Sequence, residues 1–245
     1  MMKDYLQEIV KHTQGLGLLE LIKITGTDTS TIIEAIGDDR LVILHAKFKS
    51  PVPEFVGVFG MPNLGLLNTI LNIPEYQDSA KLSLITKTLD DGTVVPSGVH
   101  FENKSGDFKN DYRFMDHNVV AEKLKSVTMK SVAWHVEFEP TANAIMRLKF
   151  QAQANPQEPS FVARTENGDL KVYFGDPASH AGNFVFQDSV TGKLTRPWHW
   201  PVNVVVAILG LSGDKKIRLS DEGVMQITVD SGLGVYDYKI PALSK

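Results

Sequence analysis

Residues 201–240 read PVNVVVAILGLSGDKKIRLSDEGVMQITVDSGLGVYDYKI and predict one helix followed by three strands. Pro201 stands where a helix tolerates proline best, at its first turn, and the apolar run Val202 to Leu209 follows directly. A turn at Asp221-Glu222-Gly223 separates β-rich runs, since carboxylates and glycine favour turns. The expected strands are Lys216 to Leu219, Val224 to Val229 and Val235 to Ile240.

A similar order of elements occurs earlier in the chain. Pro62 opens a short helix with a broad apolar face, formed by Leu64, Leu66, Leu67, Ile70 and Leu71. The matching markers lie 139 residues apart for Pro62 and Pro201, about 135 for Lys81 and Lys216, and about 131 for Asp91 and Glu222. Small drifts of this kind are what loop-length changes between two copies produce. Residue identity between the halves is slight, so the repeat rests on pattern and chance agreement is the alternative.

The remaining elements fit two copies of one α+β domain. Residues 2–13 have apolar side chains at helical spacing, and Pro140 opens a corresponding helix whose apolar members are Ala142, Ile145, Met146 and Phe150. We predict a first domain over 1–115, a linker over 116–131 and a second domain over 132–245, each with antiparallel sheets and two helices. Further strands are expected at Leu19 to Thr25, Ser30 to Ala35, Leu41 to Phe48, Lys81 to Leu89, Thr93 to Val95, Gly98 to Glu102, Tyr112 to Met115, 132–138, Phe161 to Thr165, Leu170 to Phe174 and Asn183 to Asp188.

Composition excludes several classes of protein. The 245 residues are 42% hydrophobic and 22% charged, with a net charge of -4, which is an ordinary globular balance. Cysteine is absent, which removes disulfides, thiol nucleophiles and thiolate metal sites. The longest apolar run, Val204 to Leu211, is far short of the roughly 20 residues of a bilayer helix. We also expect no secretory signal, because charges interrupt the apolar spacing near the N-terminus.

Catalytic signatures are missing from the sequence. It contains no Gly-x-Ser-x-Gly elbow, no phosphate-binding glycine loop and no His-Glu-x-x-His motif, and its seven histidines fall in different predicted elements. Two stretches resemble sites. Residues 175–180, which contain Asp176, Ser179 and His180, are expected to form a polar turn. Trp198 and Trp200 are expected to pack the start of a helix, with base stacking as the alternative. We therefore expect no catalytic residue, no metal and no cofactor.

Four cations could form a binding face. Lys3 and Lys11 lie on the first helix, and Arg147 and Lys149 lie on its counterpart in the second copy. Plain solvated surface is the alternative for such residues. If equivalent helices point the same way, the charges add into one stripe that suits a phosphate backbone, although the chain as a whole is acidic.

Three stretches carry a resemblance to a known family. Residues 111–116 (DYRFMD), residues 132–140 (VAWHVEFEP), and the end of the chain, where strands over 216–229 precede VYDYKIPA at 235–242, resemble the DNA sliding clamps, meaning the proliferating cell nuclear antigen (PCNA) and the clamps of tailed phages. The resemblance implies the DNA-clamp fold and a non-enzymatic homotrimeric ring around duplex DNA. Such a ring tethers a replicative DNA polymerase for processive synthesis and is placed on DNA by a clamp loader. It also suggests a phage protein in the host cell cytoplasm.

The resemblance further implies a partner-peptide site between the domains. Its expected residues are Val119, Val120 and Leu124 in the linker and Tyr238, Ile240, Pro241 and Ala242 in the tail. The alternative for the linker residues is that they only tether it to a sheet. The sequence departs from the family in the helices after Pro62 and Pro201, which contain no Lys or Arg and have only Asn63, Asn68, Asn72 and Asn203 as polar side chains of useful reach.

Two other hypotheses remain open at this point. The chain could be a β-rich structural or assembly protein of a virion with duplicated sandwich domains, in which case both helical faces are ordinary surface. It could also be an enzyme of an unrecognised type, which would require a cleft with convergent polar groups.

Overall fold

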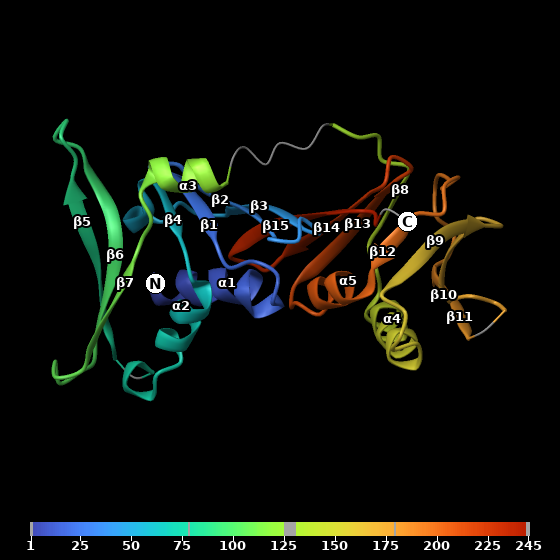
Figure 1. Cartoon of the computed structure of the whole chain (residues 1–245), viewed down its shortest axis with the longest axis horizontal. Coiled ribbons are helices and arrows are strands. Elements are labelled where there is room, and N and C mark those ends of the chain that lie inside the picture. The colour runs from blue at the N-terminus through green and yellow to red at the C-terminus, as the bar shows by residue number, and fades with distance from the viewer. Residues whose placement is uncertain (1, 78, 125–130, 179, 244–245) are drawn as a thin grey trace. The chain divides into compact units, whose positions relative to one another are not determined.

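The computed structural model describes residues 2–77, 79–124, 131–178 and 180–243, and it divides into two compact units (Figure 1). Unit 1 consists of Met1–Thr128 together with Gly232–Tyr236, and unit 2 consists of Met129–Ser231 together with Asp237–Lys245. No helix in the described part of the chain is long and apolar enough to cross a membrane.

Unit 1 is a mixed α+β structure with antiparallel strands. One sheet contains the strands in the order β4-β1-β2-β3, and a second contains them in the order β5-β6-β7. The elements are α1 (Met2–His12), the 3₁₀ turn η1 (Gln14–Leu16), β1 (Ile22–Thr27), β2 (Ser30–Ile36), β3 (Ile43–Phe48), η2 (Pro53–Phe55), β4 (Gly57–Met61), α2 (Leu64–Leu71), η3 (Pro74–Tyr76), β5 (Lys81–Thr88), β6 (Val94–Glu102), β7 (Lys109–Arg113) and α3 (His117–Lys123).

The helices of unit 1 bury one apolar stripe each. In α1 the buried side chains include Leu6, Ile9 and Val10, which recur at helical spacing. Strands β1 and β2 alternate buried and partly exposed residues, as strands with one covered face do. Helices α1 and α2 contact each other and lie side by side in Figure 1. Helices α1 and α2 therefore form one layer of the unit, and α3 packs on β4.

Unit 2 repeats this arrangement with the same classes of element. One sheet contains β14, β13 and β8 next to β15, and the other has the order β11-β10-β9-β12. Helices α4 and α5 contact each other. The elements are β8 (Val136–Phe138), α4 (Ala142–Ala154), β9 (Ser160–Glu166), β10 (Asp169–Gly175), β11 (Ala181–Gln187), β12 (His199–Pro201), α5 (Val202–Leu209), β13 (Asp214–Ser220), β14 (Val224–Asp230) and β15 (Gly234–Pro241).

The structure corrects several predicted details. The predicted strand over 132–138 is shorter, because only Val136–Phe138 pairs with β13. Helix α4 buries Ala144 and Leu148, whereas Met146 and Phe150, predicted as its apolar face, are 49% and 58% exposed. The sequence did not predict the strands β4 and β12, the helix α3 or the 3₁₀ turns η1, η2 and η3. Part of the predicted linker is helical as α3, and residues 125–130 lie outside the described residues.

Candidate functional site

The two predicted cations of α1 have different surroundings. The Lys3 ammonium is half-buried and donates hydrogen bonds to the backbone carbonyls of Tyr76, at 2.6 Å, and Gln77, at 3.3 Å. Lys11 is exposed in the last turn of α1, where a cation is favoured by the helix dipole. Lys3 therefore ties α1 to η3, and Lys11 presents its charge at the surface.

The two predicted cations of α4 also differ. Arg147 donates from Nη1 to the Val185 carbonyl at 3.2 Å, and its guanidinium lies 5.0 Å from the centre of the Phe184 ring. Lys149 is half-buried, and its ammonium group lies beside Gly210 at the end of α5. The ammonium nitrogen is 3.6 Å from the position that a Cβ atom on Gly210 would occupy. The carbonyls at a helix C-terminus attract a cation. Arg147 is thus held against β11, whereas Lys149 lies beside the end of α5.

Lys215, which the sequence analysis did not single out, adds to the charge near Lys149. Its ammonium donates to the Gly213 carbonyl at 2.8 Å. Partial burial lowers the pKa of Lys215, Asp214 opposes this, and the nearby positive charge of Lys149 lowers it further. Two cations from α4 and β13 therefore share one region, and an incoming anion would relieve their repulsion. The neighbouring Lys216 has a different role, because its ammonium pairs with Glu137 at 2.5 Å.

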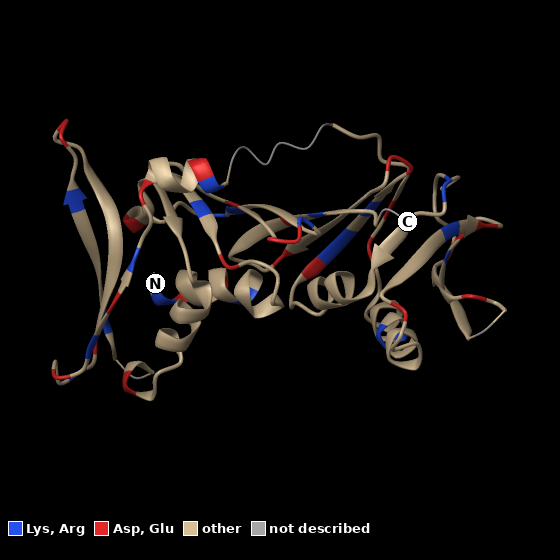
Figure 2. Cartoon of the chain, in the orientation of Figure 1, with Lys and Arg blue, Asp and Glu red and all other residues tan. Residues whose placement is uncertain are grey.

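Helices α2 and α5 contribute no charge, as Figure 2 shows by their uniformly tan ribbons. In α2 the Asn72 amide donates to the Asn68 backbone carbonyl and side-chain oxygen, both at 2.8 Å. Asn63 caps the helix in a left-handed conformation, and Asn203 is exposed on α5. A DNA-facing layer built on these helices would therefore depend on α1, α4 and Lys215 for its positive charge.

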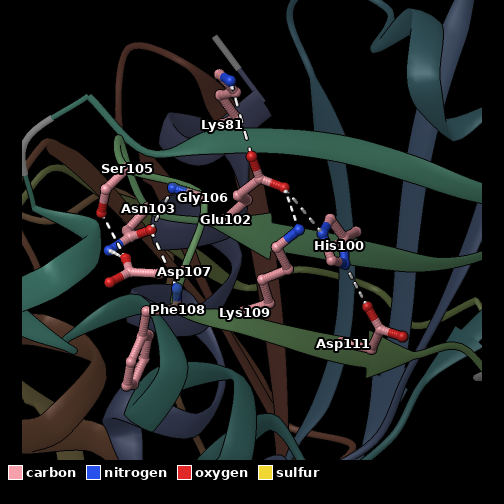
Figure 3. Close-up of polar contacts among 10 residues, drawn as sticks. All are labelled: Lys81, His100, Glu102, Asn103, Ser105, Gly106, Asp107, Phe108, Lys109 and Asp111. Atoms are coloured by element: carbon pink, nitrogen blue, oxygen red, sulfur yellow. Dashed lines mark hydrogen bonds and ion pairs between the residues drawn. The ribbon is translucent and has the colours of Figure 1, made fainter.

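The outer face of the β5-β6-β7 sheet carries a network of paired charges (Figure 3). The Glu102 carboxylate accepts from Lys109 at 3.0 Å and lies 3.7 Å from Lys81, and Lys109 contributes most to lowering the pKa of Glu102. A His100 ring nitrogen lies 2.6 Å from Asp111, and this hydrogen bond lowers the pKa of that carboxyl. The lysines of this face form ion pairs with carboxylates on neighbouring strands. We therefore infer that they stabilise the pairing of the strands rather than contact DNA.

The predicted linker residues occupy different positions on α3. Val120 is fully buried, and a Cβ placed on Gly60 of β4 would lie 2.9 Å from its side chain. Val119 is 43% exposed, and Leu124 is buried at the end of the helix. The tethering interpretation therefore fits Val120, whereas Val119 is available at the surface.

A cavity of about 730 Å³ lies in unit 1 beside the end of α3. Its lining combines apolar and charged residues, and Leu124 is the one predicted peptide-site residue among them. The apolar part is formed by Leu21, Ile36, Ile43, Pro62, Met115 and Leu124, and the charged part by Glu20, Asp38, Arg40, Glu122 and Lys123. A hollow that combines apolar contacts with charged groups can hold a short peptide. The sequence did not predict the β2 and β3 residues, because they approach α3 only in the folded unit.

The predicted tail residues are mostly covered. Tyr238 and Ile240 are 0% exposed, whereas Pro241 and Ala242 are partly exposed. The Ala242 amide donates to the Gly223 carbonyl at 2.8 Å, which fixes the tail against the turn before β14. Tyr238 and Ile240 therefore shape the tail from beneath, and Pro241 and Ala242 form its surface.

The two stretches that resembled sites have structural roles. After β10 the Ala178 amide is bonded to the Asp176 side chain at 2.8 Å, as in an Asx turn, and Ser179 lies outside the described residues. Trp200 is buried, and the Trp198 indole donates to the Asp221 carbonyl at 2.8 Å, which confirms the packing interpretation. Within the described residues, no group of three or more His, Asp or Glu side chains could hold a metal ion.

Comparison with known proteins identifies the fold. No protein-family profile matches the sequence, and no curated protein matches it. PCNA from A. fulgidus, in a complex with the C-terminal region of FEN-1, is 10% identical with a TM-score of 0.71, and the match covers 99% of this chain and 96% of that one. PCNA from Thermococcus kodakaraensis is 13% identical with a TM-score of 0.65, covering 99% and 97%. The chain therefore has the PCNA fold along its whole length, which confirms the predicted duplicated α+β clamp fold.

Proposed function

We propose that this protein is a sliding clamp, a non-enzymatic ring that encircles duplex DNA and tethers a replicative DNA polymerase. The observation that supports the proposal is the structural likeness to PCNA over 99% of the chain. The likeness includes both units and is not limited to one domain. Fold alone does not determine function. The cations beside the helices and the cavity beside α3 are the local features that suit this role.

DNA contact would come from sparse cations rather than from a strongly basic surface. We propose Lys11, Lys149 and Lys215 as the residues that reach phosphates. Lys3 and Arg147, the other two predicted contacts, would contribute long-range charge, because Lys3 donates to two backbone carbonyls and Arg147 is held both by the Val185 carbonyl and over the Phe184 ring. A topological ring needs only weak and sequence-independent contacts, which fits a chain with a net charge of -4.

Partner proteins would insert a short peptide into the cavity beside α3. Leu124 and Met115 offer apolar contacts there, and charged residues at the rim can fix the orientation of a peptide. The A. fulgidus PCNA complex with the FEN-1 C-terminal region is a precedent for a peptide bound to this fold. We propose that Val119, which is exposed on α3 above the buried Val120, extends this site. The tail residues Pro241 and Ala242 of unit 2, which lie over the buried Tyr238 and Ile240, are proposed as further contacts for partner proteins.

The ring would contain three copies of the chain, because clamp rings have six domains and this chain has two. Its mass in solution would be about 81 kDa, three times the 27.1 kDa of one chain. We further propose a clamp loader as a partner, and a phage origin with action in the host cytoplasm.

Processive synthesis tests the proposed function. A polymerase from the same source, supplied with this protein and its loader on primed circular DNA, is expected to give much longer products per binding event when an excess of trap DNA is present. A Val119→Glu variant is expected to lose this effect while keeping the mass of the ring and its fold, because Val119 is 43% exposed and the new charge would obstruct the proposed peptide site. Unchanged product length with and without the protein would contradict the proposal.

A further inference from the structure

Unit 2 contains a hollow that the proposed function does not use. Its volume is about 710 Å³, which lies within the range of roughly 300–1,000 Å³ that ligand pockets have. It opens on one face of the β11-β10-β9-β12 sheet, and we call it the β9 hollow. The side chains that give the β9 hollow its chemistry are Glu158, Val162, Arg164, Tyr173, Asp176 and His199.

Strand β9 supplies the floor of the hollow, because its side chains alternate between the two faces of the sheet. Phe161 is buried on the core side, whereas Val162 and Arg164 line the hollow. Val162 is only 9% exposed, and Tyr173 of β10 and His199 of β12 lie directly opposite it on the two neighbouring strands. The floor is therefore apolar at its centre and has a ring on each side.

Hydrogen bonds and stacking hold these two rings in place. His199 Nδ1 lies 3.2 Å from the Ser160 hydroxyl. The Tyr173 hydroxyl donates to Glu166, and this hydrogen bond contributes most to lowering the pKa of Glu166. The Arg164 guanidinium lies 5.4 Å from the centre of the Tyr173 ring. The walls of the hollow are thus ordered in advance, which reduces the entropy that a ligand loses on binding.

One end of the hollow is negatively charged. Glu158 precedes β9 and Asp176 follows β10, and since these strands are antiparallel, both carboxylates lie at the end of the hollow near Ser160. The Ala178 amide donates to Asp176 at 2.8 Å and fixes that carboxylate. Glu158 is half-buried. A cation that entered this end would meet two carboxylates.

The opposite end is positively charged. Arg164 lies four residues beyond Ser160 on β9, which corresponds to about 13 Å at about 3.3 Å per residue. Glu166 is close to Arg164, but its carboxylate already pairs with Lys171 at 3.1 Å. This end therefore keeps a net positive charge, and an anion is favoured there.

An extended peptide matches this order of groups. Its alternate side chains point to the same side, and its residues i and i+4 lie about 13 Å apart. A basic residue at i would meet Glu158 and Asp176, and an acidic residue at i+4 would meet Arg164. An apolar residue at i+2 would cover Val162. A nucleic acid matches less well, because the two carboxylates repel phosphates.

We propose that the β9 hollow binds an extended segment of a partner protein that has a basic, an apolar and an acidic residue at alternate positions. The two charged ends would select the segment, and the apolar floor would contribute contact area. The hollow lies wholly within unit 2, whereas the cavity beside α3 lies in unit 1. The proposal therefore depends neither on that cavity nor on the ring.

Fluorescence anisotropy with short peptides tests the site on the full chain. The probe is the peptide Lys-Ser-Val-Ser-Glu with blocked ends and a neutral fluorophore. The controls are Lys-Ser-Val-Ser-Lys and Glu-Ser-Val-Ser-Glu, each of which places a like charge at one end of the hollow. The probe should bind at least about 10-fold more tightly than either control.

Charge variants of the protein should change this order in a defined way. Arg164→Glu makes both ends negative, so Lys-Ser-Val-Ser-Lys should then bind about 10-fold more tightly than the probe. Damage to the fold would instead weaken all three peptides alike. Lys193→Glu, at an exposed lysine outside the hollow, is the matched control and should keep the wild-type order. Val119→Glu should also keep it, because Val119 lies on α3 in unit 1.

The outcomes decide the proposal independently of the sliding-clamp function. Equal binding of the three peptides to the wild type, or an unchanged order in Arg164→Glu, would overturn it. Absence of binding of every peptide at about 1 mM would overturn it as well. Displacement of the probe by a single-stranded oligonucleotide would assign the hollow to nucleic acid instead. A failure of this kind would leave the processive-synthesis test of the clamp unaffected.

Discussion

Truncation of Val120 to alanine tests whether α3 is held in place by one buried side chain. Helix α3 has seven residues, far fewer than the roughly 12 to 15 that an isolated helix needs for marginal stability in water. Its docking therefore depends on packing, and Val120 is fully buried against Gly60 of β4. Removing two buried methyl groups should cost about 2–3 kcal/mol, at about 0.8 kcal/mol per group plus a term for the cavity left behind.

The measurement is hydrogen exchange of the amides in residues 117–124. A loss of about 2–3 kcal/mol corresponds to about 30- to 150-fold faster exchange if α3 opens locally. Binding of a partner peptide should weaken in parallel, because Leu124 at the end of α3 lines the cavity. Val119→Ala on the same helix is the control and should change stability by less than about 0.5 kcal/mol, since Val119 is 43% exposed. Unchanged exchange in the Val120 variant would show that α3 does not depend on this side chain for its docking.

Three further predictions concern charge, pH and backbone strain. Lys215→Ala should reduce the salt dependence of DNA binding by about 0.9 in the log–log slope for each phosphate that Lys215 neutralises, whereas Lys216→Ala, which removes a paired lysine, should leave it unchanged. Burial acts against ionisation of Asp221, but hydrogen bonds from the segment before Trp198 outweigh it and lower the pKa of Asp221. This carboxylate therefore stabilises the fold above its unfolded pKa of about 3.9 and ceases to do so as pH falls through its lower folded pKa, so Asp221→Asn should flatten acid unfolding curves below about pH 4. Gly192→Ala should cost about 2–4 kcal/mol in chemical denaturation, because φ is 95° and the new Cβ would lie 1.8 Å from a carbonyl oxygen; Gly17→Ala, with φ of 70° and open space, should cost only about 1–2 kcal/mol.

Periodicity predicted the regular elements of this fold well. The helix Val202–Leu209 has the bounds predicted from Pro201 and its apolar run, and α1 ends one residue before the predicted limit. Strong local signals of this kind depend little on tertiary contacts. The repeat, inferred from marker spacing, agrees with two units that share the same classes of element.

The missed elements depend on tertiary contacts. Strand β4 contains Gly57 and Gly60, which weaken any strand signal, yet Gly60 is needed because Val120 approaches it closely. Strand β12 is only three residues long and ends in Pro201, so helix and strand signals overlap there. The spacing of apolar residues correctly predicted that α4 is a helix, but two of those residues, Met146 and Phe150, are exposed rather than buried. Periodicity cannot distinguish an apolar side chain that is buried from one that is exposed.

The candidate sites were predicted in part. Cations on α1 and α4 could be found by helical spacing, whereas Lys215 could be identified only once α4 and the start of β13 were in place. Adjacent lysines on a strand point to opposite faces, and this alternation was the available signal. The cavity residues Ile36 and Ile43 gave no signal, because an apolar residue at the end of a strand is usually core.

Retention on DNA of different topology would show whether this chain encircles a duplex. After loading, the protein should co-elute with nicked circular DNA in gel filtration and should be released when one cut linearises the circle, because a ring slides off a free end. Equal retention on circular and linear DNA would show direct binding instead, and would contradict the account of this chain as a sliding clamp.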